Sequence, residues 1–508
     1  MRGHMVLYRG YLKSCNYQCS YCPFSKHPMS QRELEKDRER WISFVQKYEE
    51  RAERLGIRAM MIVPYGEAMI HPWYWEGLAR MSAQAWTHGV GAQTNLSFPV
   101  EKFLEAYKEM NGLVGKLRLW ATFHPEMTTV SAFADRCRQL TEAGAALCAG
   151  SVGVPENINV LRQLKSRLPE EVYLWVNKMD GLKRPYTEEE KEAFWEIDPY
   201  FIRELTPVRA DVSRCENRLF VESDGRIHTC NISKVLESRW EEKIPAPECN
   251  RKICSCYLAY GGRSDYMNRI LFGEYPLYRI PRRPKAVFFD IEGTLLPEES
   301  LLIRPGEERS VAAGLEALAR DGTRLFFATT LPYEEAMKRC RYIRRLFQGG
   351  IFAGGAHIRL EYEQNAGEGM ESCSEADIDS LKRGKEYFAW LDEQVGEYFT
   401  TLKRKYHFNI LTYKQRGKTY KITLLRPKQR KWEAEEAEEM MAQAPEYGEQ
   451  IRYYIEGNCL QIVAGKADKA SGVKTLCRWL GISPEEVIAI GDSEEDKGMM
   501  ALCGASWF

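Results

Sequence analysis

The chain has 508 residues, 44% hydrophobic and 12% aromatic, so it can bury more than one core and should divide into two or three domains. Its 72 Lys and Arg residues balance its 72 Asp and Glu residues, which excludes a strongly basic nucleic-acid-binding or membrane-binding surface for the chain as a whole. We therefore expect a small molecule or a peptide as partner, and neither nucleic acid nor membrane. No apolar run reaches the length of a membrane span and nothing resembles a signal peptide, so we expect a cytoplasmic protein.

Six strand-like apolar runs alternate with helix-like segments in residues 1–199. This alternation predicts parallel strands joined by helices, an α/β fold with six βα units that form a partial, open TIM-like barrel. Polar site residues of such barrels gather at the carboxyl ends of the strands. The predicted strands cover residues 6–12, 58–63, 89–94, 117–123, 145–152 and 172–176.

Three cysteines, Cys15, Cys19 and Cys22, directly follow the first predicted strand. Thiolates are the usual ligands of iron–sulfur clusters, and a tight loop can aim three of them at one centre and leave the fourth iron of a 4Fe-4S cluster open. The alternative is a zinc site, but zinc loops commonly pair two cysteines with a distant second pair, and no such pair lies nearby. We favour the iron–sulfur cluster.

The C-x3-C-x2-C spacing, with Tyr21 before the last cysteine, resembles the signature of the radical S-adenosylmethionine superfamily. The resemblance implies that S-adenosyl-L-methionine binds the open iron and that a donor such as flavodoxin or ferredoxin supplies an electron. It further implies reductive cleavage of that cofactor and abstraction of hydrogen from a substrate. At the ends of successive predicted strands it assigns cofactor contacts to Gly66, Glu67, Asn95, Thr122, His124 and Val152, although each could instead be a turn or a satisfied polar residue.

A second group of cysteines lies in residues 200–265. It resembles the twitch or SPASM-type extensions of radical enzymes, which implies an auxiliary 4Fe-4S cluster bound by four of the five, with a structural zinc site as the alternative. A Pro- and Arg-rich stretch, residues 266–284, is then expected to be a linker. The five cysteines are Cys215, Cys230, Cys249, Cys254 and Cys256.

A second α/β pattern occupies residues 285–508 and begins with a buried strand that ends in Asp290. An acid there can attack phosphorus in line, while a second acid two residues later, Glu292, protonates the leaving oxygen. The sequence D-x-E-G-T resembles the first motif of the haloacid dehalogenase superfamily, with Glu where Asp is usual. By that resemblance Thr329 and Lys469 hold the phosphate, and Asp290, Asp492 and Asp496 provide carboxylates for Mg²⁺.

The same resemblance implies a Rossmann-like domain with an α+β cap at about 331–460, similar to the cap of sugar-phosphatase-like members, which selects a small organic phosphate. The chain ends shortly after Asp496, so we expect the further strand and helix of such domains to be missing, with an exposed sheet edge. Our leading hypothesis is a bifunctional enzyme that joins radical chemistry to Mg²⁺-dependent phosphate hydrolysis. The alternative is a radical peptide-modifying enzyme in which residues 285–508 are a non-catalytic binding module.

Overall fold

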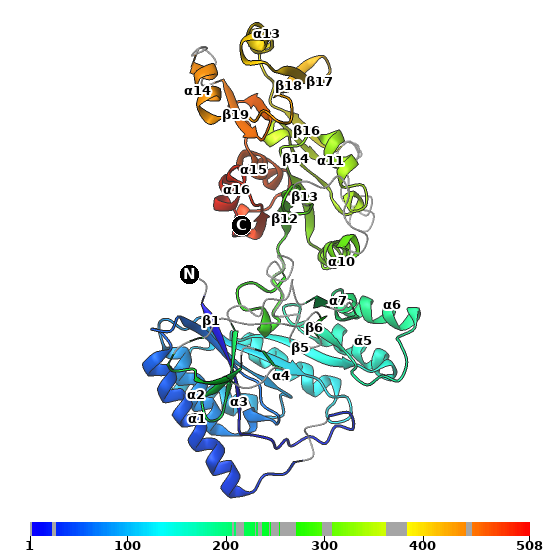
Figure 1. Cartoon of the computed structure of the whole chain (residues 1–508). Coiled ribbons are helices and arrows are strands. Elements are labelled where there is room, and N and C mark those ends of the chain that lie inside the picture. The colour runs from blue at the N-terminus through cyan, green and yellow to red at the C-terminus, as the bar shows by residue number, and fades with distance from the viewer. Residues whose placement is uncertain are drawn as a thin grey trace. The chain divides into compact units, whose positions relative to one another are not determined.

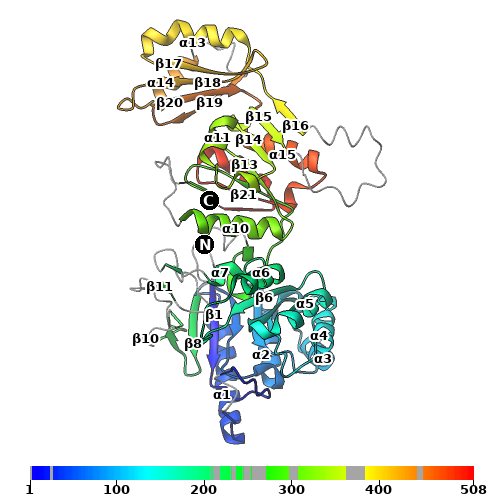
Figure 2. The same cartoon turned by 90° about the vertical axis from the view of Figure 1, so that its right-hand side faces the viewer.

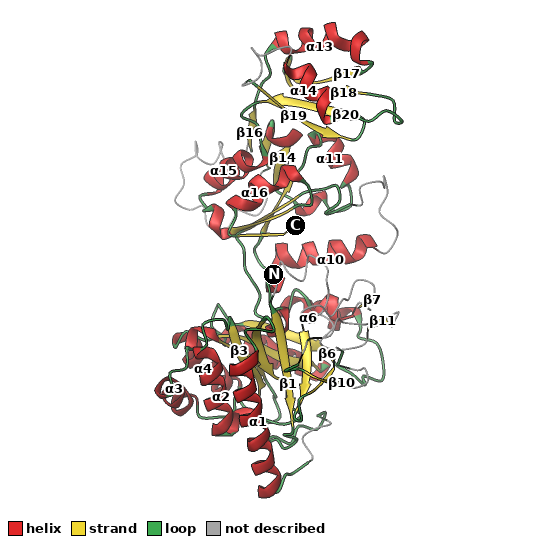
Figure 3. Ribbon diagram, turned by 60° about the vertical axis from the view of Figure 1, so that its left-hand side comes forward, coloured by secondary structure: helices red, strands yellow, loops and turns green. Residues whose placement is uncertain are grey.

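The computed structural model describes residues 3–22, 27–205, 208–209, 218–228, 230–231, 236–242, 244, 253–254, 271–296, 307–361, 384–442 and 450–507. The chain forms two compact units, Met1–Arg282 and Arg283–Phe508 (Figure 1). Each unit is built around its own sheet, as Figure 3 shows by the colours of strands and helices.

The first unit contains a nine-stranded sheet in the order β10-β9-β8-β1-β2-β3-β4-β5-β6. Strands β1 to β6 follow one another in chain order and pair in parallel, so their carboxyl ends meet at one edge. All six predicted strands are confirmed, as β1 (His4–Gly10), β2 (Ile57–Ile62), β3 (Gly89–Thr94), β4 (Leu117–Thr122), β5 (Ala146–Gly153) and β6 (Tyr173–Lys178). Strand β8 (Arg218–Glu222) extends the parallel sheet beside β1, and β9 (Arg226–His228) and β10 (Leu236–Arg239) continue it in antiparallel fashion.

Helices alternate with these strands and bury apolar side chains against one face of the sheet. Helix α1 (Gln31–Arg51) is capped by Ser30, which forms a capping box with Glu33, and it buries Trp41 and Phe44 beside Tyr8. The remaining helices of this unit are α2 (Pro72–Ala83), α3 (Val100–Glu109), α4 (Val130–Glu142), α5 (Ile158–Arg167), α6 (Glu188–Ile197) and α7 (Phe201–Leu205).

The opposite face of the first sheet is covered by residues that we had expected to be a linker. Leu277 and Tyr278 are 2% and 4% exposed and pack against Met5, Leu7 and Trp120. The Tyr278 hydroxyl also donates a hydrogen bond to the carbonyl of Met60, at 2.8 Å. The described residues 271–282 therefore belong to the core of the first unit, because their aromatic and aliphatic side chains cover a sheet face that would otherwise be exposed to solvent.

The second unit contains a seven-stranded sheet in the order β16-β15-β14-β13-β12-β21-β22, which confirms an α/β, Rossmann-like domain. The strands from β14 to β22 pair in parallel, with β12 (Ala286–Phe289) between β13 (Arg324–Ala328) and β21 (Val487–Ile490). The remaining strands are β14 (Gly349–Phe352), β15 (His357–Leu360), β16 (Lys385–Phe388) and β22 (Ala505–Trp507). Helices α10 (Glu307–Arg320), α11 (Tyr333–Arg339), α15 (Lys469–Leu480) and α16 (Lys497–Leu502) connect them.

A separate four-stranded antiparallel sheet, in the order β17-β18-β20-β19, carries its own hydrophobic core (Figure 2). Its elements are β17 (Asn409–Gln415), β18 (Lys418–Leu425), β19 (Ile451–Glu456), β20 (Cys459–Ala464), α13 (Glu393–Tyr406) and α14 (Ala434–Ala442). We call this α+β body the cap. It starts later than the expected residue 331, because β14, β15 and β16 pair in the main sheet instead.

The end of the chain also differs from the sequence expectation. Helix α16 and strand β22 follow Asp496, and β22 pairs in parallel with β21. The helix and strand that we expected to be missing are therefore present in short form, so β21 is not the edge of the sheet.

Candidate functional sites

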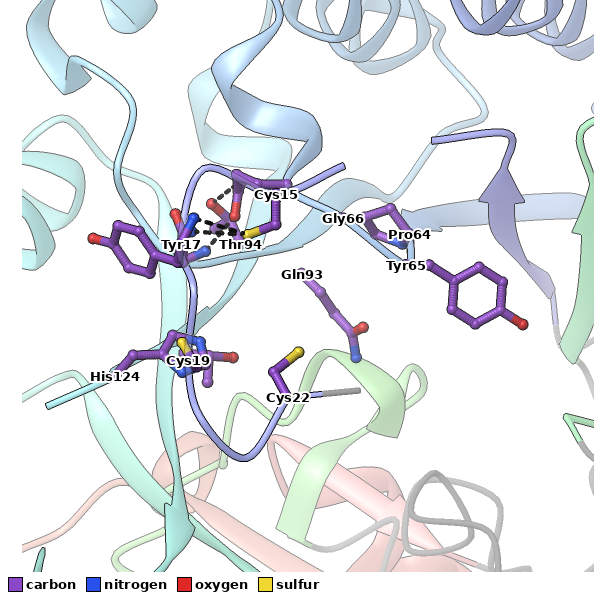
Figure 4. A pocket seen from close by; sticks show the side chains of 13 residues that line it. Cys15, Tyr17, Cys19, Cys22, Pro64, Tyr65, Gly66, Gln93, Thr94 and His124 are labelled. Atoms are coloured by element: carbon purple, nitrogen blue, oxygen red, sulfur yellow. Dashed lines mark hydrogen bonds between the residues drawn. The ribbon is translucent and has the colours of Figure 1, made fainter. Parts of the chain in front are cut away.

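The loop that follows β1 carries Cys15, Cys19 and Cys22 around a cavity of about 150 Å³ at the carboxyl edge of the first sheet (Figure 4). Besides the three cysteines, the cavity is lined by Tyr17, Pro64, Tyr65, Gly66, Glu67, Gln93, Thr94, Asn95, Thr122 and His124. Five of the six residues expected to contact a cofactor are thus brought together, and Val152 is not among the lining residues. Sequence reasoning had not selected Tyr17, although it lies between Cys15 and Cys19 in the same loop.

Gly66 allows the loop after β2 to lie directly against the cysteine loop. A Cβ atom at this position would lie 1.9 Å from the carbonyl oxygen of Ser14, which is closer than any side chain permits. The same carbonyl accepts a hydrogen bond from the backbone N–H of Glu67, at 3.0 Å. The glycine of the expected cofactor-binding segment therefore has a direct role in placing Cys15.

Two further strand ends hold the cysteine loop. After β3, the Asn95 amide donates to Asn16 at 3.2 Å and to the Cys15 sulfur at 3.7 Å. After β4, the Tyr21 hydroxyl contacts His124 Nδ1 at 2.8 Å. The Ser20 backbone and hydroxyl donate to Glu126 at 2.8 Å and 2.5 Å, a contact that no sequence pattern indicated.

Glu67 is buried beneath this loop and both of its carboxylate oxygens are engaged. Oε1 accepts from Thr94 Oγ1 at 2.8 Å and from the Met69 N–H at 3.0 Å, and Oε2 accepts from the Asn95 N–H at 2.6 Å. Burial raises the pKa of Glu67 to about 7, against the lowering effect of these three donors. In this structure Glu67 joins the ends of β2 and β3.

The cysteine site carries little charge of its own. Burial, reinforced by the neighbouring thiols, raises the pKa of Cys19 to about 12, and burial also raises the pKa of Cys15. Burial lowers the pKa of His124 to about 4, so its imidazole is neutral near neutral pH. Such thiols become thiolates when a metal replaces their protons.

The second group of predicted ligands falls mostly outside the described residues. Cys215, Cys249 and Cys256 lie there, while Cys254 is in β11 (Ile253–Cys254), which pairs with β7 (Val208–Arg209). Cys230 follows β9 as a described residue. The auxiliary cluster remains a prediction.

The second unit brings together the residues predicted for phosphate chemistry. Asp290 follows β12, and Lys469 is the first residue of α15. The ammonium of Lys469 lies 2.8 Å from Asp290 Oδ1 and 2.6 Å from Asp496 Oδ1, and all three residues are buried. Asp290, Asp492 and Asp496 each offer a carboxylate oxygen within 4.8 Å of the others, a spacing that suits one divalent cation.

Two turns fix these acids. At Gly293, with φ +74°, a Cβ atom would lie 1.8 Å from Asp492 Oδ2, so the first motif needs its glycine both for backbone conformation and for space. Asp496 accepts from the Ser493 backbone at 3.0 Å and hydroxyl at 2.7 Å. The Thr294 hydroxyl donates to Asp492 at 3.2 Å.

The ammonium of Lys469 offsets part of the negative charge of this site before any metal binds. Burial opposes the charge on Lys469, but the carboxylates of Asp290 and Asp496 outweigh it and raise the pKa of the ammonium above its ordinary value. Burial raises the pKa of Asp290, and Lys469 opposes that rise. The site therefore holds the buried carboxyl group of Asp290 beside the fixed cation of Lys469.

The other two predicted residues lie at the ends of neighbouring segments. Thr329 follows β13 and is buried, and its hydroxyl accepts from the Leu331 N–H at 3.1 Å. Glu292 forms an ion pair with Arg339 at the end of α11. Arg339 was not found from the sequence, because no motif links it to Glu292.

Residues 287–507 match the haloacid dehalogenase-like hydrolase family. A 59-residue stretch is 37% identical to a phosphoglycolate phosphatase of Methanobrevibacter smithii and covers 12% of this chain and about a quarter of that protein's length. Solved structures of haloacid dehalogenase-like hydrolases from Bacteroides thetaiotaomicron and B. subtilis are 18% and 17% identical, with TM-scores of 0.33 and 0.32. Each alignment covers 44% of this chain and 86% or 88% of the solved one.

The C-terminal half of the chain is therefore a haloacid dehalogenase-like hydrolase domain. In the part of the chain that the structure describes, no helix combines the length and apolarity that crossing a bilayer requires.

Proposed function

We propose that the second unit is a Mg²⁺-dependent phosphohydrolase that acts on a small organic phosphate. The observation that carries this proposal is the cluster of Asp290, Asp492, Asp496 and Lys469 at the carboxyl end of the central strands. Carboxylate oxygens are the ligands that Mg²⁺ prefers, so the donor set fits the ion. When bound there, Mg²⁺ would neutralise charge on the phosphoryl group.

Each residue has a defined task in this proposal. Asp290 attacks phosphorus, while Lys469 keeps that carboxylate ionised and holds a phosphate oxygen. Glu292 gives a proton to the leaving oxygen and later takes one from the water that hydrolyses the aspartyl phosphate. Thr329 donates its hydroxyl to the phosphoryl group, and the cap selects the leaving group.

The test is release of inorganic phosphate from a broad panel of sugar, nucleotide and short-chain phosphates, with and without Mg²⁺. The change Asp290→Asn keeps the side-chain shape but removes the attacking charge, so turnover should fall by about 10³-fold or more. Asn409→Ala, at an exposed position of cap strand β17, serves as a handling control. Absence of Mg²⁺-dependent release from every compound, or retention of it by Asp290→Asn, contradicts the proposal.

For the first unit we propose a radical S-adenosylmethionine enzyme whose 4Fe-4S cluster is held by Cys15, Cys19 and Cys22. The support is a donor set of three thiols around one cavity, with a glycine at the contact between the two loops that form it. A cluster bound there would supply the electron that cleaves S-adenosylmethionine. Gly66, Asn95, Thr122 and His124 would orient that cofactor, and the walls of the cavity would exclude water.

A zinc site is the rival for the same thiols. Among the described residues, the group whose ligand atoms all lie within 4.8 Å of one another is the aspartate cluster and not the cysteines. Anaerobic reconstitution followed by iron and sulfide analysis separates the two. Iron with sulfide supports the cluster, and one tightly bound zinc with no iron contradicts it.

The proposal also concerns the substrate of the first unit. We favour a small metabolite related to the phosphate ester that the second unit hydrolyses, which makes the protein bifunctional. The alternative is a peptide substrate, with residues 285–508 acting as a binding module. Retention of Asp290, Lys469 and Asp496 in one buried ion cluster favours a working hydrolase over a module.

A further inference from the structure

We propose that Arg339 is a positioning residue that holds the carboxylate of Glu292 in place for proton transfer. The inference rests on the hydrolase function proposed above and deepens it by assigning the group that controls the acid and base. Arg339 belongs to helix α11, whereas Glu292 follows strand β12, so only the folded domain brings them together.

The guanidinium is itself fixed from two sides. Its Nη1 donates to Glu292 Oε1, and its Nη2 lies 3.3 Å from Oε1 of Glu335, one turn earlier in the same helix. The side chains of Arg339 and Glu292 are 25% and 29% exposed, so solvent screens their pair less than it screens a pair on an open surface. An arginine anchored in this way restricts the rotamers of the carboxylate that it binds.

The surroundings explain why Glu292 needs this cation. Glu292 lies among other acids, because Glu456 and Glu335 are close enough to repel its carboxylate. On the cap side, buried Lys421 in β18 faces the same acids and donates to the carbonyl of Thr330 at 2.7 Å. Among the described residues, Arg339 is the cation that makes a hydrogen bond to Glu292.

The pairing bears on both halves of the reaction. In the first half, the bond between phosphorus and the ester oxygen breaks as Asp290 binds phosphorus, and the ester oxygen takes the proton of Glu292. In the second half, water attacks the aspartyl phosphate, its proton returns to Glu292, and Asp290 is released. A freely rotating acid would spend less time in line with either oxygen, so a fixed one raises the rate of both steps.

The experiment compares kcat and KM of the wild type and Arg339→Gln for two probes: glycerol 3-phosphate, whose alkoxide leaving group needs a proton, and p-nitrophenyl phosphate, whose phenolate leaving group departs without one. Without the guanidinium the acid is no longer held, so kcat for glycerol 3-phosphate should fall about tenfold, kcat for p-nitrophenyl phosphate should fall less, and KM should change little for either probe. Arg339→Lys, which keeps the charge and a hydrogen-bond donor, should recover part of the rate with glycerol 3-phosphate.

Two further variants separate positioning from a structural role. Arg341→Gln removes an exposed arginine two residues beyond the helix and should leave kcat unchanged for both probes. Glu335→Gln removes the second anchor of Arg339 and should lower kcat for glycerol 3-phosphate more than for p-nitrophenyl phosphate, though by less than Arg339→Gln does. This second variant keeps the proposal testable if Arg339→Gln does not fold.

The outcomes are distinct. An equal fall in kcat for both probes overturns the positioning role, as does an unchanged kcat for glycerol 3-phosphate in Arg339→Gln or in Glu335→Gln. A wild type that hydrolyses neither probe nor any other phosphate ester in the presence of Mg²⁺ overturns the hydrolase function itself.

Discussion

The two candidate sites lie at equivalent places in their sheets but differ in how the charge of their ligand side chains is compensated. Both lie where parallel strands end, on loops closed by a glycine that no larger residue can replace. In the second unit, Lys469 compensates Asp290 and Asp496 within hydrogen-bonding distance. In the first unit, burial keeps Cys15 and Cys19 protonated, and the loop is held by hydrogen bonds from three strand ends. The acids of the second unit are thus paired with a cation of the protein, whereas the thiols of the first unit are kept neutral by burial.

The largest effect on activity is expected when the compensating cation of the second unit is removed. Lys469→Met leaves two buried carboxylates facing each other, and phosphate release should fall by about 100-fold or more. Mg²⁺ restores positive charge to the cluster, so it should raise the melting temperature of this variant more than that of the wild type. Lys474→Met, at an exposed position of the same helix, is the control. Equal Mg²⁺ effects on Lys469→Met and the wild type contradict a charge-balancing role.

The corresponding test in the first unit concerns Gly66. A methyl group there would clash with the carbonyl oxygen of Ser14. Gly66→Ala should therefore displace the cysteine loop and remove most of the reconstituted iron. Gly115→Ala, where nothing lies within 4 Å of the added atom, should bind iron as the wild type does. Iron and sulfide analysis of the three proteins measures this difference. Full iron content in Gly66→Ala shows that the loop contact does not control the site.

A smaller effect is expected from Glu67, which holds two strand ends together. Its pKa rises from an ordinary 4.5 to about 7 on folding, so the folded protein binds more protons than the unfolded chain within that window, and stability falls as pH rises through it. Glu67→Gln cannot ionise and should lose this dependence, a change on the order of 2 kcal/mol between the two ends of the window. Denaturant unfolding at both pH values measures it. Identical pH dependence in the two proteins contradicts an ionisable, buried Glu67.

The sequence predicted the parts of the fold that follow local periodicity. The six strands of the first sheet and the order of Asp290, Thr329, Lys469 and Asp492 are visible because buried parallel strands are continuous apolar runs and site residues follow their ends. The role of residues 271–282 was missed, because proline and arginine suggest a solvated linker unless the sheet face that they cover is known. Arg339 and Glu126 were missed for a similar reason, since only tertiary structure sets them beside Glu292 and Ser20.

The boundary of the cap could not be predicted from the sequence either. In the sequence, the strands of the cap look like those of the main sheet. Only the pairing of the folded strands shows where the chain leaves the main sheet for the cap sheet. The short α16 and β22 were overlooked because so few residues follow Asp496.

The most direct test of the central claim is to trap the covalent intermediate on the second unit. The full-length protein is mixed with Mg²⁺ and a phosphate ester that it hydrolyses, quenched with acid and digested, and the peptides are analysed by mass spectrometry. We predict that one phosphoryl group is found on the peptide that contains Asp290, that it requires Mg²⁺, and that Asp290→Asn abolishes it. Turnover with the phosphoryl group on another residue, or turnover by Asp290→Asn at the wild-type rate, would contradict the account.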